Sequence, residues 1–170
     1  MNAKTKAFFS GTMAVLFGMA ANLALAADGD NFVDEASAKG LAEIETAKLA
    51  LEKGTAEDIR AFAQQMIDDH TKSNQELAQL AGEKNLEISD NATLMDKAKA
   101  MILQMRDGEN FDQAYANNQV VAHEQTIELY RDYIQDGENA DLKRFAEQTL
   151  PTLEQHLEHA RKLQAQHGQR

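Results

Sequence analysis

Residues Thr55–Lys84, TAEDIRAFAQQMIDDHTKSNQELAQLAGEK, carry a periodic pattern from which the rest of the fold can be predicted. Apolar residues recur there at three- and four-residue steps: Ile59, Phe62, Ala63, Met66, Ile67, Leu77, Leu80 and Ala81. This is the apolar stripe of an amphipathic helix that faces a core. Thr55 followed by Asp58 predicts a capping box at its start. At about 100° per residue, His70 falls in the middle of the stripe, where it must be hydrogen-bonded, bound to a metal or strained.

The composition predicts a single, all-helical domain. The chain has 170 residues, enough for one domain with a proper core, and it contains no Cys, no Trp and one Pro. Ala, Leu, Glu, Gln and Lys are abundant, and these residues favour helices. The net charge of −11 argues against a basic face that binds nucleic acid or an anionic membrane. The absence of Cys excludes disulfides, thiolate metal sites and a cysteine nucleophile.

Residues 1–26 are predicted to be a cleaved secretory signal peptide. Lys4 and Lys6 form a basic n-region, and a mostly apolar stretch follows. Ala24-Leu25-Ala26 then fits the small-x-small cleavage rule. An uncleaved membrane anchor is the alternative, although several polar residues interrupt the apolar stretch. We therefore expect export and cleavage after Ala26.

The remainder, residues 27–170, is predicted to form a single four-helix-bundle domain. It contains no second apolar segment long enough to span a membrane as a helix. We expect an exported, periplasmic protein with no transmembrane segment in its mature form, and a peripheral position on the cell envelope stays open.

Four long helices and one short helix are predicted within this domain. The long helices are expected at 30–53, 55–84, 109–135 and 141–164, and the short one at 92–106. Two short turns and one long connection, 85–108, join them. This arrangement predicts a ferritin-like four-helix bundle with one long crossover connection that carries a short extra helix. The fold class is all-α, with no strand signals.

Two details of packing follow from residue types within these helices. Gly40 is unfavourable in a helix interior, so it is expected to permit close approach of a neighbouring helix or ligand. The short helix contains Met95, Met101 and Met105. Thioethers suit copper(I), but methionines at helical spacing are expected to be ordinary core filling.

Three histidines are predicted to converge inside the bundle. His70, His123 and His156 come from different long helices, and each lies on the inward stripe near the middle of its helix. Mid-helix positions share one layer of a bundle whichever way each helix runs, and Glu43 of the first helix lies at the edge of the same layer. Three imidazoles and a carboxylate or water suit one divalent transition metal, Zn, Cu, Ni or Fe. The alternative is a hydrogen-bonded or water-filled polar core layer.

Several charged residues and histidines lie near this layer in sequence. Asp69, Glu124 and Glu154 could support the metal ligands, although their directions around the helices point mostly elsewhere. His159 lies off the stripe and His167 lies in a tail that should fray, so both are expected to be solvated.

The pattern is not that of a typical di-iron oxidase. Such sites use Glu-x-x-His on two helices and a Glu from each of the other two. Here Ile67 and Leu153 stand three residues before His70 and His156, so too few inward carboxylates remain. No nucleophile–base pair or phosphate-binding loop indicates another reaction. An enzyme is therefore less expected than a binding protein.

Four segments carry a resemblance to a known family: GLAEIETAKLALEKG, IRAFAQQMIDDHTKSNQEL, FDQAYANNQVVAHEQTIELY and LKRFAEQTLPTLEQHLEHARKL. They resemble the bacterial exported ferritin-like family of unknown function whose members are often labelled "predicted outer membrane protein". The resemblance covers Asn31–Leu163 and implies a ferritin-like bundle outside the cytoplasm. It matches His70, His123, His156 and Glu43 to family positions, but it implies no reaction or substrate. The residues themselves do not support the outer-membrane label.

Two function classes remain. The first is a periplasmic bundle that binds a divalent transition metal for storage, sequestration or sensing. The alternative is a non-catalytic structural or stress-related module of the cell envelope, in which the histidines form a hydrogen-bonded core layer. No nucleic-acid partner is expected, and the sequence indicates no particular protein partner.

Overall fold

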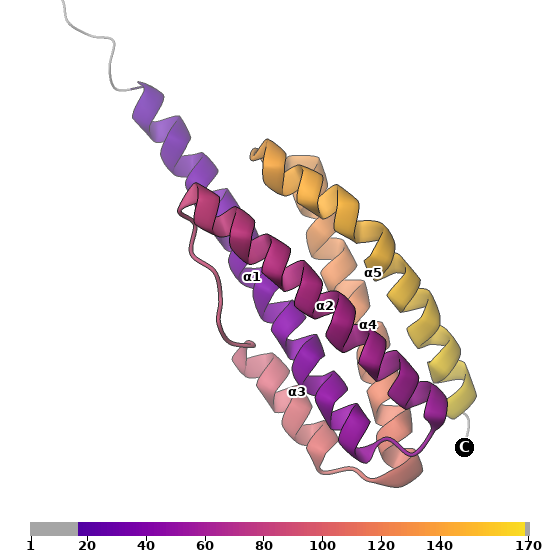
Figure 1. Ribbon diagram of the computed structural model, residues 1–170. Coiled ribbons are helices and arrows are strands. Elements are labelled where there is room, and N and C mark those ends of the chain that lie inside the picture. Colours follow the sequence, from indigo (N-terminus) through magenta and orange to yellow (C-terminus); the bar gives the residue numbers. More distant parts are fainter. Residues whose placement is uncertain (1–16, 169–170) are drawn as a thin grey trace, which may run out of the picture.

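A computed structural model describes residues 17–168, and it consists almost entirely of helix. The five helices are α1 (Phe17–Lys53), α2 (Glu57–Lys84), α3 (Leu94–Gln104), α4 (Gly108–Asp136) and α5 (Ala140–His167). The four long helices form a bundle, and α3 lies along its outside beside α1 (Figure 1). Because α2 and α4 run in the same direction, the connection that carries α3 has to return along the bundle (Figure 1). The predicted all-α, ferritin-like architecture is confirmed.

The helix bounds agree with the predicted ones within about a turn, except at the start of α1. This helix begins at Phe17, so the predicted cleavage point after Ala26 lies within it. Residues 1–16 lie outside the described part of the chain. The cleaved signal peptide 1–26 and the domain 27–170 therefore stay predictions. In the described part, no helix is both long enough and apolar enough to cross a membrane.

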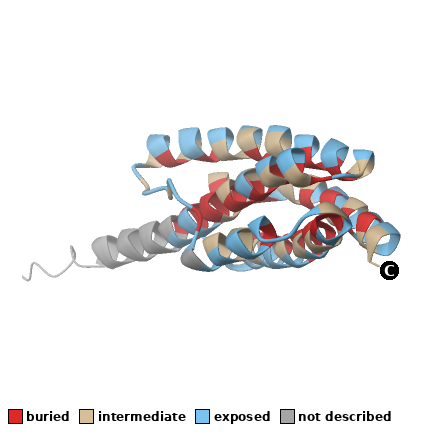
Figure 2. Cartoon of the chain, turned by 90° about the horizontal axis from the view of Figure 1, so that it is seen from below, coloured by how far each residue is buried: buried red, intermediate tan, exposed pale blue. Residues whose placement is uncertain are grey.

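The core of the bundle consists of two apolar clusters with a polar layer between them. One cluster includes Phe62, Met66, Phe111, Val120 and Leu163. The other includes Phe32, Leu77, Ile127, Leu142 and Leu153. Figure 2 shows that the buried residues face the interior of the bundle and the exposed ones face outward. Along α2, α4 and α5, a histidine lies at each point where residues of one cluster give way to those of the other.

The first turn of α2 is capped by a carboxylate from another helix. Asp112 of α4 is buried and accepts hydrogen bonds from the backbone N–H groups of Thr55 and Ala56, both at 3.0 Å, and from the Thr55 hydroxyl. A carboxylate at this position also suits the positive end of the helix dipole. The predicted capping box of Thr55 and Asp58 is wrong, because Asp112 takes its place and the N-cap residue Ala56 makes no side-chain cap.

The end of α5 is anchored beside the start of α2. Nε2 of His167 lies 3.1 Å from both carboxylate oxygens of Asp58, which also accepts a hydrogen bond from the backbone N–H of Ile59 at 2.9 Å. The ring of His159 packs edge-on against Phe62 with 4.8 Å between the ring centroids. The expectation that His159 and His167 are simply solvated is therefore wrong, since both side chains have specific partners.

Gly40 permits close contact between α1 and α2, as predicted. A Cβ atom at this position would lie 2.3 Å from Oδ1 of Asn74 in α2. The Asn74 side chain crosses the contact and donates a hydrogen bond to the backbone carbonyl of Ser37, at 3.3 Å. A side chain at residue 40 would therefore displace the side chain of Asn74 and its hydrogen bond to Ser37.

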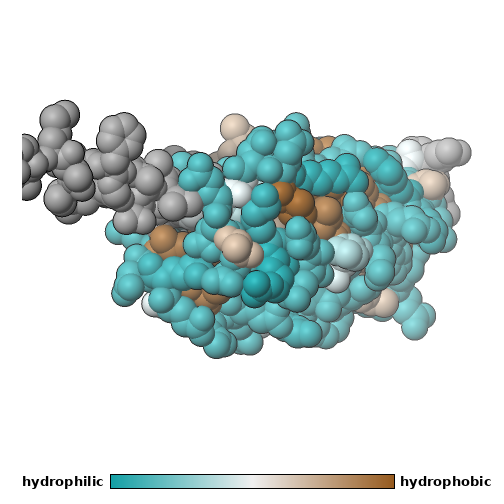
Figure 3. Space-filling model, turned by 90° about the horizontal axis from the view of Figure 1, so that it is seen from above, coloured by the Kyte–Doolittle hydropathy of each residue, from teal (hydrophilic) through white to brown (hydrophobic). Residues whose placement is uncertain are grey.

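The methionines of α3 do not fill the core. Met95, Met101 and Met105 are 68 %, 66 % and 85 % exposed, so the core-filling prediction is wrong for all three. The four long helices already enclose the core, and α3 contacts them from outside through Leu103, which is buried. The face of the molecule in Figure 3 is otherwise largely hydrophilic, with hydrophobic residues in small groups.

Candidate metal centre

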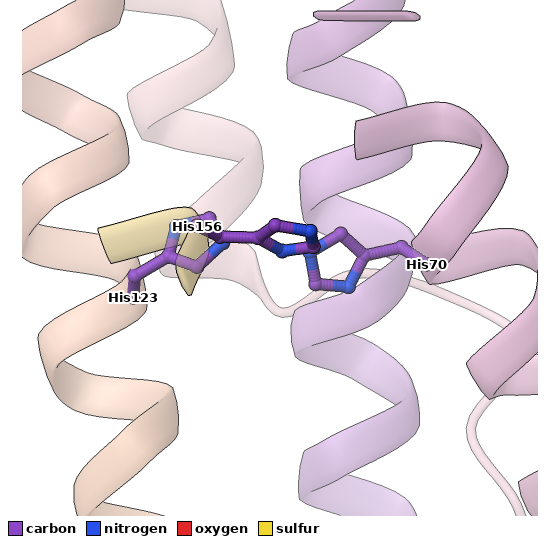
Figure 4. Close-up of side chains that lie close together, drawn as sticks. All are labelled: His70, His123 and His156. Carbon is purple, nitrogen blue, oxygen red and sulfur yellow. The ribbon is translucent and has the colours of Figure 1, made fainter. Parts of the chain in front are cut away.

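His70 of α2, His123 of α4 and His156 of α5 meet in the middle of the bundle (Figure 4). Their ring centroids form a nearly equilateral triangle with sides of 5.6, 5.6 and 5.4 Å. One nitrogen of each ring lies within 4.8 Å of the corresponding nitrogens of the other two. All three side chains are buried. The predicted convergence of the three histidines is therefore present in the structure.

Two hydrogen bonds determine which nitrogens of His123 and His156 carry a proton and which keep a lone pair. Nδ1 of His123 lies 2.9 Å from the backbone carbonyl of Gln119, which can only accept, so Nδ1 carries the proton. Nε2 of His156 lies 2.9 Å from a carboxylate oxygen of Asp69 and donates to it in the same way. This leaves Nε2 of His123 and Nδ1 of His156 as lone-pair nitrogens, and neither has a hydrogen-bond partner.

Nε2 of His70 is also buried and without a hydrogen-bond partner. Each ring of the trio therefore has one buried nitrogen that no protein group satisfies. Such atoms are uncommon in protein interiors and call for water, an ion or another ligand.

The three imidazoles are neutral at neutral pH. Burial holds the pKa of His70 well below its ordinary value, and the neighbouring histidines lower it further. Burial also lowers the pKa of His123 to about 4, although the hydrogen bond to Gln119 opposes the shift. Burial lowers the pKa of His156 as well, against the opposing effect of Asp69. Neutral imidazole is the form that ligates metals.

Of the three acids expected near the site, only Asp69 forms a hydrogen bond with a histidine of the trio. Its side chain is 39 % exposed, so it connects the buried ring of His156 to the surface. Glu124 and Glu154 instead pair with Arg161 and Arg131, at 2.8 and 2.6 Å, on the outside of α4 and α5. A carboxylate that holds the outer nitrogen of a ligating histidine fixes its tautomer and strengthens it as a ligand.

Glu43, the fourth predicted ligand, is not in the group formed by the three histidine nitrogens. It is buried in α1 beside Gln119 and Tyr115 of α4. Burial raises the pKa of Glu43 to about 7, although the Gln119 side chain partly opposes the shift. Oε2 of Glu43, the Tyr115 hydroxyl and both amide atoms of Gln119 lack full hydrogen-bond geometry with any partner.

The Glu43 group was not predicted as a cluster, although the sequence contained a signal for it. Tyr115, Gln119 and His123 follow one another at intervals of four residues, so polar side chains occupy successive turns on the inward face of α4. The carbonyl of Gln119 then holds His123, which links the Glu43 group to the histidine layer through one turn of helix.

A three-nitrogen site with no fourth protein ligand suits a specific range of chemistry. Nitrogens of a tetrahedral site with metal–nitrogen bonds near 2.0 Å lie about 3.3 Å apart, so small side-chain rotations would be enough to close the trio around an ion. Imidazole ligands suit Zn(II), Cu(II), Ni(II) and Fe(II). Within residues 17–168, no carboxylate joins the trio, so the arrangement lacks the bridging carboxylates of a di-iron centre.

The fold and this site define a ferritin-like helical bundle with a histidine layer in its core. The chain belongs to the family described as a domain of unknown function, DUF4142, whose model matches residues 15–163. This agrees with the expected family of unknown function, but the match gives no support for the outer-membrane label. No curated protein matches the chain.

Two solved structures are similar in fold. A DUF305 fragment from Deinococcus radiodurans matches with a TM-score of 0.73 and 11 % identity, over 82 % of this chain and 96 % of that one. A DUF305 protein from Streptomyces coelicolor, described as a predicted secreted protein, matches with a TM-score of 0.71 and 16 % identity, over 85 % of this chain and 96 % of that one. At these identities the similarity concerns the fold alone.

Proposed function

We propose that this protein binds one divalent transition metal ion through His70, His123 and His156, and that it does so after export to the periplasm. Two observations carry the proposal: one nitrogen of each of the three buried imidazoles lies within 4.8 Å of those of the other two, and each ring has a buried nitrogen with no hydrogen-bond partner. Leaving three such atoms unsatisfied would cost about 1–3 kcal/mol each, and a metal ion would satisfy them together.

The residues around the trio support the same role. Asp69 and the Gln119 carbonyl hold the outer nitrogens, so the inner lone pairs of His156 and His123 are oriented before an ion arrives. With three protein ligands, the ion would keep one position for water or another small ligand. Storage, sequestration and sensing all fit a site of this kind. Export is supported by the predicted signal peptide.

Elemental analysis of the tag-free protein, isolated directly from the periplasm, tests the proposal. We expect about one equivalent of Zn, Cu, Ni or Fe per chain, and its loss in His123→Ala. His167→Ala is the matched control, because His167 pairs with Asp58 at the end of α5 and belongs to no layer of histidines. Metal retained in His123→Ala would place the site elsewhere.

The alternative, a cell-envelope module with a polar core layer, makes the opposite prediction. A protein that contains no metal when isolated, and takes up none after incubation with each of the four ions, would support it. The bare nitrogens would then be satisfied by buried water.

A further inference from the structure

The outer face of α3 has the composition of a core face, although it is exposed. Met95, Met101, Ile102 and Met105 are between 57 % and 85 % exposed. At about 100° per residue, these four side chains and Ala98 fall within one arc of roughly 120° on the helical wheel. The opposite side of α3 contains Asp96 and Leu103, which is buried. Lys99 lies between that side and the arc and pairs with Asp96 at 3.5 Å. The helix thus presents most of its apolar residues to solvent.

Basic residues border this apolar arc. The segment Leu94–Arg106 contains one acid, Asp96, and three bases, Lys97, Lys99 and Arg106, within a chain of net charge −11. Lys97 lies next to the arc on one side and Lys99 on the other, and Arg106 follows the last turn. An apolar arc between basic borders is the pattern of helices that lie in a membrane interface, where long basic side chains reach the headgroups.

A groove between α3 and α4 adjoins the arc. It has a volume of about 350 Å³, and its walls include Lys99 and Arg106, the amides of Asn117 and Asn118, and the apolar side chains of Ile102 and Val121. Asp and Glu are absent from its lining. Four other surface hollows in the described part of the chain each contain two or more carboxylates. The α3–α4 groove therefore combines cations, amide donors and apolar surface where the rest of the protein is acidic.

We propose that α3 and the α3–α4 groove form a docking surface for a bilayer that contains anionic phospholipid. The methionines and Ile102 enter the acyl region, and Lys99 and Arg106 bind phosphate groups at its surface. Methionine is flexible and unbranched, so it adapts to a disordered apolar phase. The negative charge elsewhere on the chain opposes this contact only weakly, because charges more than about 8 Å away are screened at physiological salt.

A second copy of the chain fits this surface less well than a bilayer does. Eleven helical residues extend about 16 Å and are about 10 Å wide, so one face of α3 covers about 160 Å², far less than the ~800 Å² that each partner contributes to a stable dimer. A bilayer needs no complementary shape, and its attraction for basic residues adds to the apolar contact.

Spin labels can test the proposal residue by residue, because the chain contains no cysteine. Met101→Cys places a label on the exposed arc, and Gln148→Cys places a control label on an exposed position of α5. The labelled proteins, isolated from the periplasm, are mixed with vesicles of phosphatidylcholine alone or with phosphatidylglycerol. We expect the label at 101 to become accessible to oxygen and shielded from a water-soluble nickel complex on the anionic vesicles, and the label at 148 to stay in water.

A charge reversal tests the phosphate contact separately. Arg106→Glu should reduce the affinity for anionic vesicles at least tenfold, whereas Lys162→Glu, at an exposed position of α5, should leave it within about twofold. A label at 101 that stays in water on both vesicles would overturn the proposal. The proposal would also be overturned if free glycerol phosphate, at a concentration equal to that of the phosphatidylglycerol, displaced the protein from the vesicles. That result would indicate a site for a small anion. A dimer in light scattering that Met101→Ser and Ile102→Ser convert to a monomer would assign the surface to a second copy.

Discussion

Two groups of buried polar side chains differ in how their hydrogen-bonding atoms are used. Asp112, near one end of the bundle, accepts hydrogen bonds from Thr55 and Ala56 and has no unpartnered atom among those the structure describes. The three histidines at the centre are equally buried, but each has one buried nitrogen without a hydrogen-bond partner. Burying a polar group costs free energy unless it is hydrogen-bonded. The Asp112 carboxylate has its donors within the protein, whereas one nitrogen of each histidine has no partner there. On our proposal, Asp112 has a structural role and the three histidines form the site for a ligand.

The largest expected effect on stability is that of removing Asp112. Asp112→Ala leaves two backbone N–H groups and a hydroxyl without their acceptor, so the free energy of unfolding should fall by about 4 kcal/mol. Urea unfolding followed by circular dichroism measures it. Asp90→Ala, in the exposed connection before α3, is the control and should change stability by less than about 0.5 kcal/mol. An equally small loss for Asp112→Ala would remove the contrast between the two groups.

Acidification should destabilise the histidine layer in the metal-free protein. The pKa of His123 is lowered to about 4, so the unfolded chain binds a proton first as the pH falls below about 6.5. Stability should therefore fall between pH 6.5 and pH 4, by about 3 kcal/mol from His123 alone. The difference in unfolding free energy between wild type and His123→Leu, measured by urea titration at pH 7, 5.5 and 4, should change by this amount. A difference that is independent of pH would mean that His123 titrates normally in the fold.

Metal should stabilise the protein through the histidines and independently of Asp112. At a free metal concentration about 100 times the dissociation constant, the free energy of unfolding should rise by about 2.7 kcal/mol. Asp112→Ala should retain this increment, and His123→Leu should lose it. Thermal unfolding with and without each ion measures both. If metal still raised the free energy of unfolding of His123→Leu, the metal would bind outside the histidine layer.

Glu43 should show the opposite pH dependence. Its pKa is raised to about 7, so the unfolded chain loses the proton first as the pH rises above its ordinary value of 4.5. Glu43 therefore destabilises the fold increasingly between pH 4.5 and pH 7. Glu43→Gln should be more stable than wild type by about 3 kcal/mol at pH 8, and not at pH 4.5, in urea titrations. A gain of equal size at both values would instead reflect packing.

The smallest effect is expected for replacing one histidine by an apolar residue of similar size. His70→Leu removes a buried nitrogen that has no hydrogen-bond partner, so the stability of the metal-free protein should change by no more than about 1 kcal/mol. Urea unfolding of His70→Leu, carried out alongside that of Asp112→Ala, measures the difference between the two losses of stability. A loss of several kcal/mol would show that His70 has a partner in the metal-free state, and the layer would then resemble Asp112.

The sequence was sufficient to predict the bundle and the meeting of His70, His123 and His156. Both depend on spacing along single helices, and mid-helix positions meet in one layer whatever the direction of each helix. The position of Glu43 depends on the axial offset of α1 relative to its neighbouring helices. The spacing of residues within a single helix does not determine this offset. Its side chain lies beside Tyr115 and Gln119, within a turn of the layer but outside the group of histidine nitrogens.

Contacts between distant segments account for the remaining errors. The Asp112 cap and the His167–Asp58 contact join residues far apart in the chain, so local signals such as Thr55 with Asp58 point to the wrong partner. The methionines of α3 have the spacing of core residues, but the four long helices leave α3 outside. Periodicity predicts an apolar face and does not say what covers it.

The histidine layer draws one residue from each of three helices, and no two of them are near neighbours in the chain. A short stretch of unfolded chain therefore contains at most one of the three ligands of the layer, unlike a zinc finger, whose paired ligands are close in sequence. Any ion that the layer takes must arrive once α2, α4 and α5 have packed together. For a chain that crosses a membrane unfolded, the choice of metal would then depend on the ions available where it folds, and not on those present where it is synthesised.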